Sequence, residues 1–196
     1  MLATVAARRS TRALGVIAEA LVVIHMRQDA VPIRVLLLSE VLAFVHRARK
    51  CAGVRRIALV GSLASDKRDP KDADVLVTVD DGADLRTLAA AGRRLKGRAQ
   101  SQNKGADIFL ASPSGNYIGR TCHWRECAPG IRMSCDARHC GARPFLHDDL
   151  GAVKLDAALV KNPPIELWPS VVRRVPVPDD VEEFLLRALE PKVHGE

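Results

Sequence analysis

Three short apolar segments, two of them separated by a helical pattern, constrain the fold of this 196-residue chain most strongly. Each is rich in aliphatic residues and has the length of a buried strand. They are 56–60 (RIALV), 73–79 (ADVLVTV) and 105–111 (GADIFLA). Residues 80–97 begin with acids, place leucines on one face and end at Gly97, which predicts a helix. Residues 33–50 carry apolar side chains at helical spacing and a basic last turn before Gly53. This order of elements predicts an α/β (α+β) fold.

The positive charge of the chain is concentrated in its N-terminal quarter. Residues 1–56 hold ten Lys and Arg against three Asp and Glu, whereas residues 57–196 hold twenty of each. A uniformly basic nucleic-acid-binding protein would have a different distribution. We therefore expect either a solvated basic helix face or a weak polyanion-binding surface near the N-terminus.

The N-terminal segment shows no secretory signal and no membrane span. The apolar run 14–26 is short and is interrupted by Glu19, so we expect no membrane association and a cytoplasmic location. Residues 1–13 are rich in Arg and free of acids, and they loosely resemble a transit peptide. The alternative is that residues 1–25 are a dispensable basic extension, since Met26 lies just before the first predicted helix.

Two carboxylates one residue apart lie at the start of the second apolar segment, where folding does not require them. Asp72 and Asp74 project to the same side of a strand, and their pKa values rise unless a cation lies between them. Oxygen ligands with open positions suit Mg²⁺. Gly61 and Ser62 end the preceding strand, where they can approach a phosphate, and Asp107 on the third predicted strand is placed to reach the same site. Together these residues predict two-metal phosphoryl or nucleotidyl transfer.

This pattern resembles the nucleotidyltransferase superfamily of DNA polymerase beta. It consists of a Gly-Ser pair, nine intervening residues, an Asp-Ala-Asp triplet and a later Asp on another strand. The similarity is greatest to its minimal bacterial members and covers roughly residues 33–111. This resemblance implies a small mixed sheet flanked by helices, with the acidic residues on adjacent strands. It also implies that a nucleoside monophosphate passes from an NTP to a hydroxyl acceptor, with release of pyrophosphate.

The resemblance also implies roles for the site residues. Asp72 and Asp74 would hold Mg²⁺, with two ions in the site. Asp107 would complete the site of the catalytic metal and help to activate the acceptor hydroxyl, and Gly61 and Ser62 would hold the triphosphate. The acceptor stays open between an RNA end, a protein and a small molecule. Some members of this superfamily belong to toxin–antitoxin pairs, so a partner chain is possible by analogy only.

Four of the five cysteines fall within 19 residues. They are Cys122, Cys127, Cys135 and Cys140. Four thiolates so close in sequence can enclose one tetrahedral Zn²⁺ in a closed, structural site. His139 is an alternative ligand in place of Cys140. Two disulfides are the other possibility, although clustered cysteines in a cytosolic protein more often bind metal.

These observations divide the chain into four expected parts. They are a basic extension (1–25), a nucleotidyltransferase domain (26–112), a Cys-rich zinc-binding module of irregular structure (113–147) and a C-terminal segment with a short helix at 179–190 (148–196). The acidic corner His147-Asp148-Asp149 is interpreted as a turn or helix start, without function. Two alternatives stay open: a non-catalytic zinc-containing RNA- or protein-binding module on a nucleotidyltransferase shell, and a hydrolase that uses the same metals on phosphodiesters.

Overall fold

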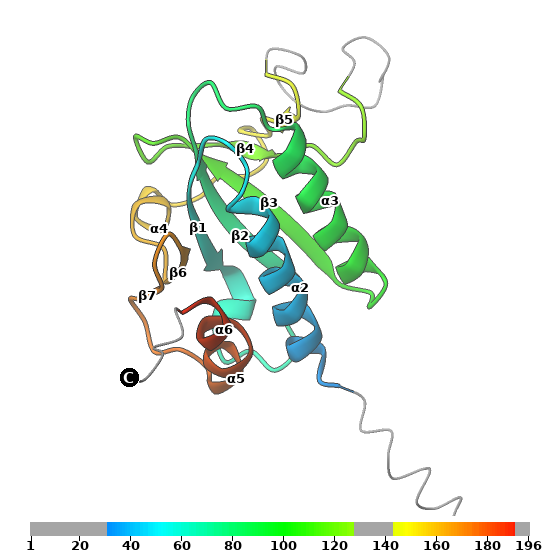
Figure 1. Ribbon diagram of the computed structural model, residues 1–196, viewed down its shortest axis with the longest axis vertical. Coiled ribbons are helices and arrows are strands. Elements are labelled where there is room, and N and C mark those ends of the chain that lie inside the picture. Colours follow the sequence, from blue (N-terminus) through cyan, green and yellow to red (C-terminus); the bar gives the residue numbers. More distant parts are fainter. Residues whose placement is uncertain (1–30, 128–142, 191–196) are drawn as a thin grey trace, which may run out of the picture. The chain divides into compact units, whose positions relative to one another are not determined.

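The computed structural model of this protein describes residues 31–127 and 143–190 (Figure 1). The chain divides into two units, Met1–Pro32 and Ile33–Glu196, and all described helices and strands belong to the second. Among the sequence predictions, those on residues 1–25, Cys135, His139 and Cys140 lie outside the described residues.

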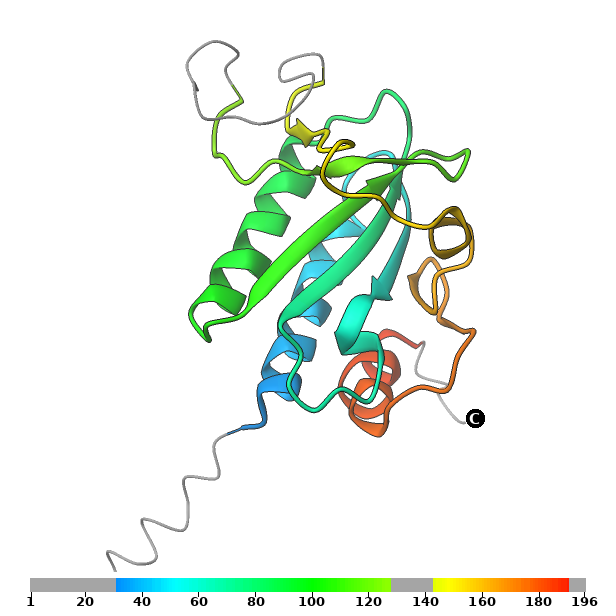
Figure 2. The same cartoon turned by 180° about the vertical axis from the view of Figure 1, so that it is seen from behind.

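A seven-stranded mixed sheet lies at the centre of the second unit, as Figures 1 and 2 show from opposite sides. Its strands are β1 (Val54–Val60), β2 (Asp72–Val79), β3 (Gly105–Ala111), β4 (Tyr117–Thr121), β5 (Leu146–His147), β6 (Ile165–Trp168) and β7 (Val172–Arg173). They are ordered β5-β4-β3-β2-β1-β6-β7. The β2–β3 pair is parallel and the other pairs are antiparallel. The predicted mixed α/β fold is confirmed.

The helices are shorter than the sequence pattern predicted. They are α2 (Ile33–Ala48), the 3₁₀ turn η1 (Gly61–Ala64), α3 (Arg86–Gln100), α4 (Ala157–Lys161) and a C-terminal helical stretch formed by α5 (Asp179–Val181), η2 (Glu182–Leu186) and α6 (Arg187–Leu189). The prediction that α3 begins near residue 80 was wrong. The Ala83 N–H donates to the Asp80 carbonyl in a turn, and the Asp84 carboxylate accepts from the Arg86 N–H at 2.8 Å. An acidic side chain that binds the first helical N–H groups favours a helix start after it.

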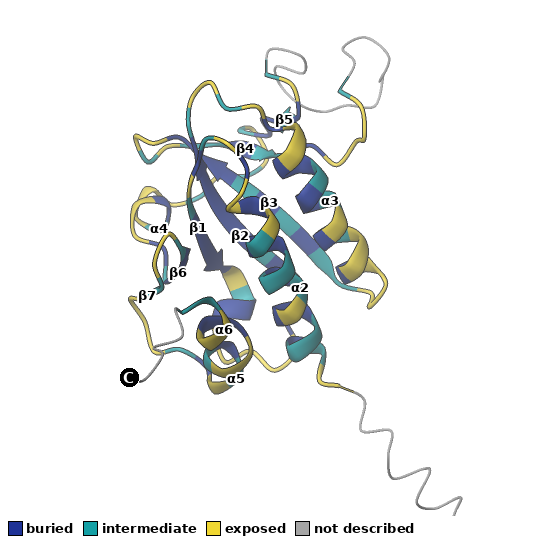
Figure 3. Cartoon of the chain, viewed as in Figure 1, coloured by how far each residue is buried: buried dark blue, intermediate teal, exposed yellow. Residues whose placement is uncertain are grey.

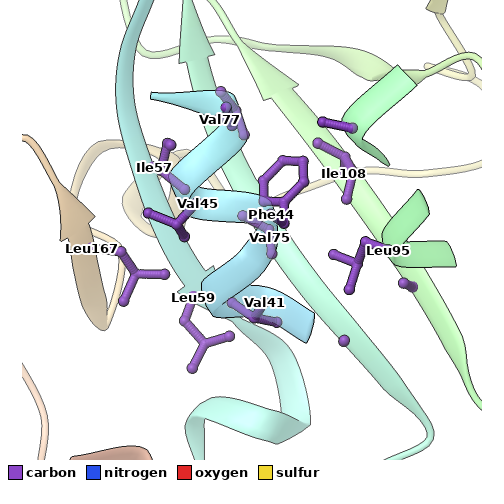
Figure 4. Packing of buried hydrophobic residues seen from close by; sticks show 14 of the residues in the cluster. Val41, Phe44, Val45, Ile57, Leu59, Val75, Val77, Leu95, Ile108 and Leu167 are labelled. Atoms are coloured by element: carbon purple, nitrogen blue, oxygen red, sulfur yellow. The ribbon is translucent and has the colours of Figure 1, made fainter. Parts of the chain in front are cut away.

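The two faces of the sheet are packed differently. Helices α2 and α3 cover one face, where Phe44, Leu95 and Ile108 meet the β2 side chains of Val75 and Val77 (Figure 4). On the other face a smaller buried cluster gathers Ala58, Val60, Leu76, Ala111 and Val160. Because side chains alternate along a strand, burial of Ala73 and Val75 against the helices turns Asp72 and Asp74 to the opposite face. Figure 3 shows that β1 and β2 are buried over most of their length.

A partly buried ion pair attaches the C-terminal helical stretch to α2. Arg34 on α2 donates to both carboxylate oxygens of Asp180 on α5, at 2.5 and 3.0 Å. The same guanidinium donates to the carbonyls of Leu63 in η1 and of Lys67 in the loop that follows η1. Arg34 therefore connects the loop after β1 to the C-terminal helix.

In the described parts of the chain, no helix has the length and apolarity needed to span a bilayer.

Candidate active site

The Gly-Ser turn at the end of β1 is shaped by the carboxylate beside it. Gly61 has a φ of +70°, and a Cβ built on it would lie 2.3 Å from the Oδ2 atom of Asp74. A side chain at this position would be strained by the backbone and would also collide with the carboxylate. Ser62 follows in a half-buried position, and its hydroxyl makes no hydrogen bond within the described residues. The turn therefore presents a hydroxyl one residue after the glycine that lies against the Asp74 carboxylate.

A second glycine makes room for the other carboxylate of the pair. Asp72 is the register partner of Gly105 on β3, and a Cβ on Gly105 would lie 2.0 Å from the Asp72 Oδ1 atom. Asp74 is the register partner of Asp107 on the same parallel strand. Register partners project to the same face of a sheet. The three aspartates predicted from the sequence therefore lie on one face of two adjacent strands.

The crowding of these carboxylates appears in the pKa of Asp74. Burial, followed by the charges of Asp72 and Asp107, raises it from 3.8 to about 7. A carboxylate in this environment favours its neutral form unless a cation balances the charge. Asp74 is thus the residue at which a proton and a metal ion would compete.

Asp107 is engaged by cations. Its Oδ1 atom accepts a hydrogen bond from Arg120 on β4 at 3.1 Å and lies 3.7 Å from the ammonium of Lys96 on α3. The Nε atom of Arg120 lies 2.6 Å from Asp149, which also accepts a hydrogen bond from the Tyr117 hydroxyl at 2.8 Å. Burial and this hydrogen bond raise the pKa of Tyr117. Asp149 and Tyr117 therefore hold Arg120 against Asp107.

This supporting network was not predicted from the sequence. Asp149 was assigned no function, and β4 and β5 were not predicted, because the segment 113–147 carries turn-forming and cysteine residues without clear alternation. The pairing of Arg120 with His147 across β4 and β5 brings Asp149 next to Arg120. No local signal marks this contact, since its partners are 29 residues apart in the sequence.

The donor chemistry of the three aspartates fits Mg²⁺, because all are carboxylates and hard divalent ions prefer oxygen. In the described residues, however, no three His, Cys, Asp or Glu side chains stand in positions that could together ligate a metal. The geometry gives the reason: Asp107 is turned to Arg120 and Lys96. Asp107 would have to exchange its cationic partners in order to join Asp72 and Asp74 at a metal ion.

The described part of the Cys-rich segment lies next to this network. Cys122 is buried just after β4, and its N–H donates to the Phe145 carbonyl at 2.8 Å. Cys127 is half-buried and packs against the core. The remaining predicted zinc ligands lie outside the described residues. The structure thus places the Cys122 thiol near one edge of the sheet, where β4 and β5 pair.

Comparison with known proteins gives one match. Residues 18–127 match a protein family described as "Family of unknown function (DUF6932)". The matched segment begins inside the predicted extension and contains every predicted residue of the acidic site, together with Cys122 and Cys127. No curated protein and no solved structure matches the chain. Because the match covers more than half of its length, the chain belongs to the DUF6932 family.

Proposed function

We propose that this protein is a Mg²⁺-dependent nucleotidyltransferase. It would transfer a nucleoside monophosphate from an NTP to a hydroxyl on an RNA end, a protein or a small molecule. One observation carries the proposal: Asp74 lies over the side-chain-free Gly61 and beside Asp107 on the parallel neighbouring strand. Two glycines, one in the turn after β1 and one at the start of β3, make room for two carboxylates, and folding requires neither carboxylate there; the arrangement therefore favours a function over a folding role.

The residues of the site have distinct tasks in this proposal. Asp72 and Asp74 would hold Mg²⁺, which when bound supplies charge neutralisation and polarisation of the phosphates. The Gly61–Ser62 turn offers a hydroxyl and close backbone approach to the triphosphate. Asp107 accepts the proton of the acceptor hydroxyl, and Arg120 orients the Asp107 carboxylate through its hydrogen bond.

A structural zinc site and a cytoplasmic location complete the proposal. Cys122 and Cys127, together with Cys135 and either Cys140 or His139, would hold one Zn²⁺. A closed four-ligand site would stabilise the segment and take no part in the transfer.

The test uses each of the four NTPs labelled at the α-phosphate, with Mg²⁺ and total cell extract. We expect wild-type protein and an Asp66→Asn control to label one acceptor class, because Asp66 is exposed in the loop after η1. Asp74→Asn should transfer no label while remaining folded. Failure of every NTP to label an acceptor would contradict the proposal and favour a binding module. Cleavage of phosphodiesters without NTP would favour a hydrolase.

A further inference from the structure

A small pocket opens directly beside Asp107. It has a volume of about 180 Å³ and lies at the edge of β3, which β4 pairs only from Phe109 to Ala111. Arg93 and Lys96 of α3 line one side, and Arg120 and the residues that follow it line the other. Asp107 therefore belongs both to the acidic site and to the wall of this pocket.

The pocket carries more positive than negative charge. Three cations line it, Arg93, Lys96 and Arg120, against the single carboxylate of Asp107. The distance of 3.7 Å between Lys96 and Asp107 is too long for a hydrogen bond, so the ammonium keeps its donors available. A cluster of cationic donors with one carboxylate among them is suited to an anion.

Arg93 is the most informative of these cations. Its guanidinium donates to the Trp124 carbonyl at 2.8 Å and has no carboxylate partner in the described parts of the chain. Partial burial lowers its pKa. Partial desolvation of a charge without a counterion is unfavourable, and a bound anion would offset it.

The size of the pocket limits the group that it can take. Pockets for whole drug-sized ligands have volumes of about 300 to 1,000 Å³. A volume of about 180 Å³ suits one phosphate or one sugar phosphate rather than a complete nucleoside triphosphate. The pocket is therefore too small for the NTP, and it opens on the side of Asp107 away from the Gly61 turn, since β3 lies between β2 and β4.

We infer that this pocket binds a phosphate group of the acceptor, so that the acceptor is a phosphorylated molecule whose hydroxyl reaches Asp107. The inference rests on the proposed function. In the transfer, the acceptor oxygen forms a bond to the α-phosphorus of the NTP, the bond from that phosphorus to the bridging oxygen breaks, and pyrophosphate leaves. The hydroxyl proton passes to Asp107. The phosphate belongs either to the last linkage of an RNA or to a small sugar phosphate.

The test measures binding without catalysis, in buffer without Mg²⁺, chelator or NTP, by calorimetric titration at low salt. The probes are the RNA trinucleotide ApApA with a free 3′-hydroxyl, ribose 5-phosphate, and uncharged ribose. We expect one phosphorylated probe to bind, and Arg93→Gln and Lys96→Gln each to weaken it at least about tenfold. The control is Arg94→Gln, an exposed neighbour on the same helix, which should bind like wild type.

Each outcome decides a separate point. Tighter binding of ApApA identifies an RNA end as the source of the phosphate, and tighter binding of ribose 5-phosphate identifies a small molecule. Absence of binding by both probes, equal binding of ribose, or equal loss in the Arg94→Gln control overturns the inference. Lys96→Gln keeps the test decisive if Arg93→Gln does not fold, because Lys96 is more than one-third exposed. Since no NTP is present, failure here is distinct from failure of label transfer.

Discussion

Replacing Asp74 by Asn should stabilise the metal-free protein at alkaline pH while it abolishes transfer. The pKa of Asp74 is raised from 3.8 to about 7, so the folded protein holds a proton there that the unfolded chain has already lost. The stability contributed by this proton is fully present below pH 3.8 and is lost as the pH rises through 7. The raised pKa corresponds to about 4 kcal/mol. Because water and salt screen a half-buried carboxylate, we expect a measured gain of about 2 kcal/mol at pH 8.

Urea unfolding of the proteins in Mg²⁺-free buffer without chelator, at pH 4.5 and pH 8, measures this effect. The gain from Asp74→Asn should fall to about a quarter at pH 4.5, where most folded wild-type molecules carry the proton. Asp66→Asn, at an exposed carboxylate, should show no such pH dependence. Mg²⁺ should stabilise wild type at pH 8, by about 2.7 kcal/mol at a hundredfold excess over its Kd, and Asp74→Asn much less. Equal gains at both pH values, or destabilisation at pH 8, would refute the electrostatic argument.

Three further substitutions test the site and its supports. Gly61→Ala should lower the free energy of unfolding by about 2 kcal/mol or more and abolish transfer, whereas Gly82→Ala, where a Cβ has open space, should be nearly neutral in thermal melts. Arg34→Ala should lower the free energy of unfolding in urea by about 3 kcal/mol, because it leaves the partly buried Asp180 carboxylate without its ion-pair partner. The control Arg49→Ala, at an exposed position, should change this free energy by less than about 0.5 kcal/mol. Elemental analysis should find about one zinc per chain. Cys127→Ser should lower the zinc content and increase proteolysis within residues 113–147. Two intact disulfides in the unreduced protein would contradict the zinc assignment.

The sequence alone determined the strands and the position of the acidic pair. The aliphatic runs at 56–60, 73–79 and 105–111 became the central strands because local alternation and side-chain type are sufficient to specify them. The same alternation places Asp72 and Asp74 on one face, whatever the rest of the chain does. The zinc ligands, the metal ions and the activity stay predictions.

Only the tertiary structure decided what surrounds the pair. The sequence pattern carries no register, and the parallel pairing of β2 with β3 is what places Asp107 beside Asp74 and Gly105 beneath Asp72. The role of Gly105 was not predicted, because its close approach to Asp72 crosses two strands that are separated by helix α3. The helix itself begins six residues later than predicted, because acids at a helix start and acids in a preceding turn give the same sequence pattern.

The network behind Asp107 also required the folded chain. Arg120 and Asp149 meet because β4 and β5 pair, and neither strand has a sequence long or regular enough to be predicted. The basic pocket beside Asp107 joins α3 to β4, elements that contact each other only after the sheet has formed. Local sequence specifies which faces of a strand are apolar or charged. The choice of neighbouring strands depends instead on burying all the apolar faces at once. That choice brought Arg93 and Lys96 next to Arg120.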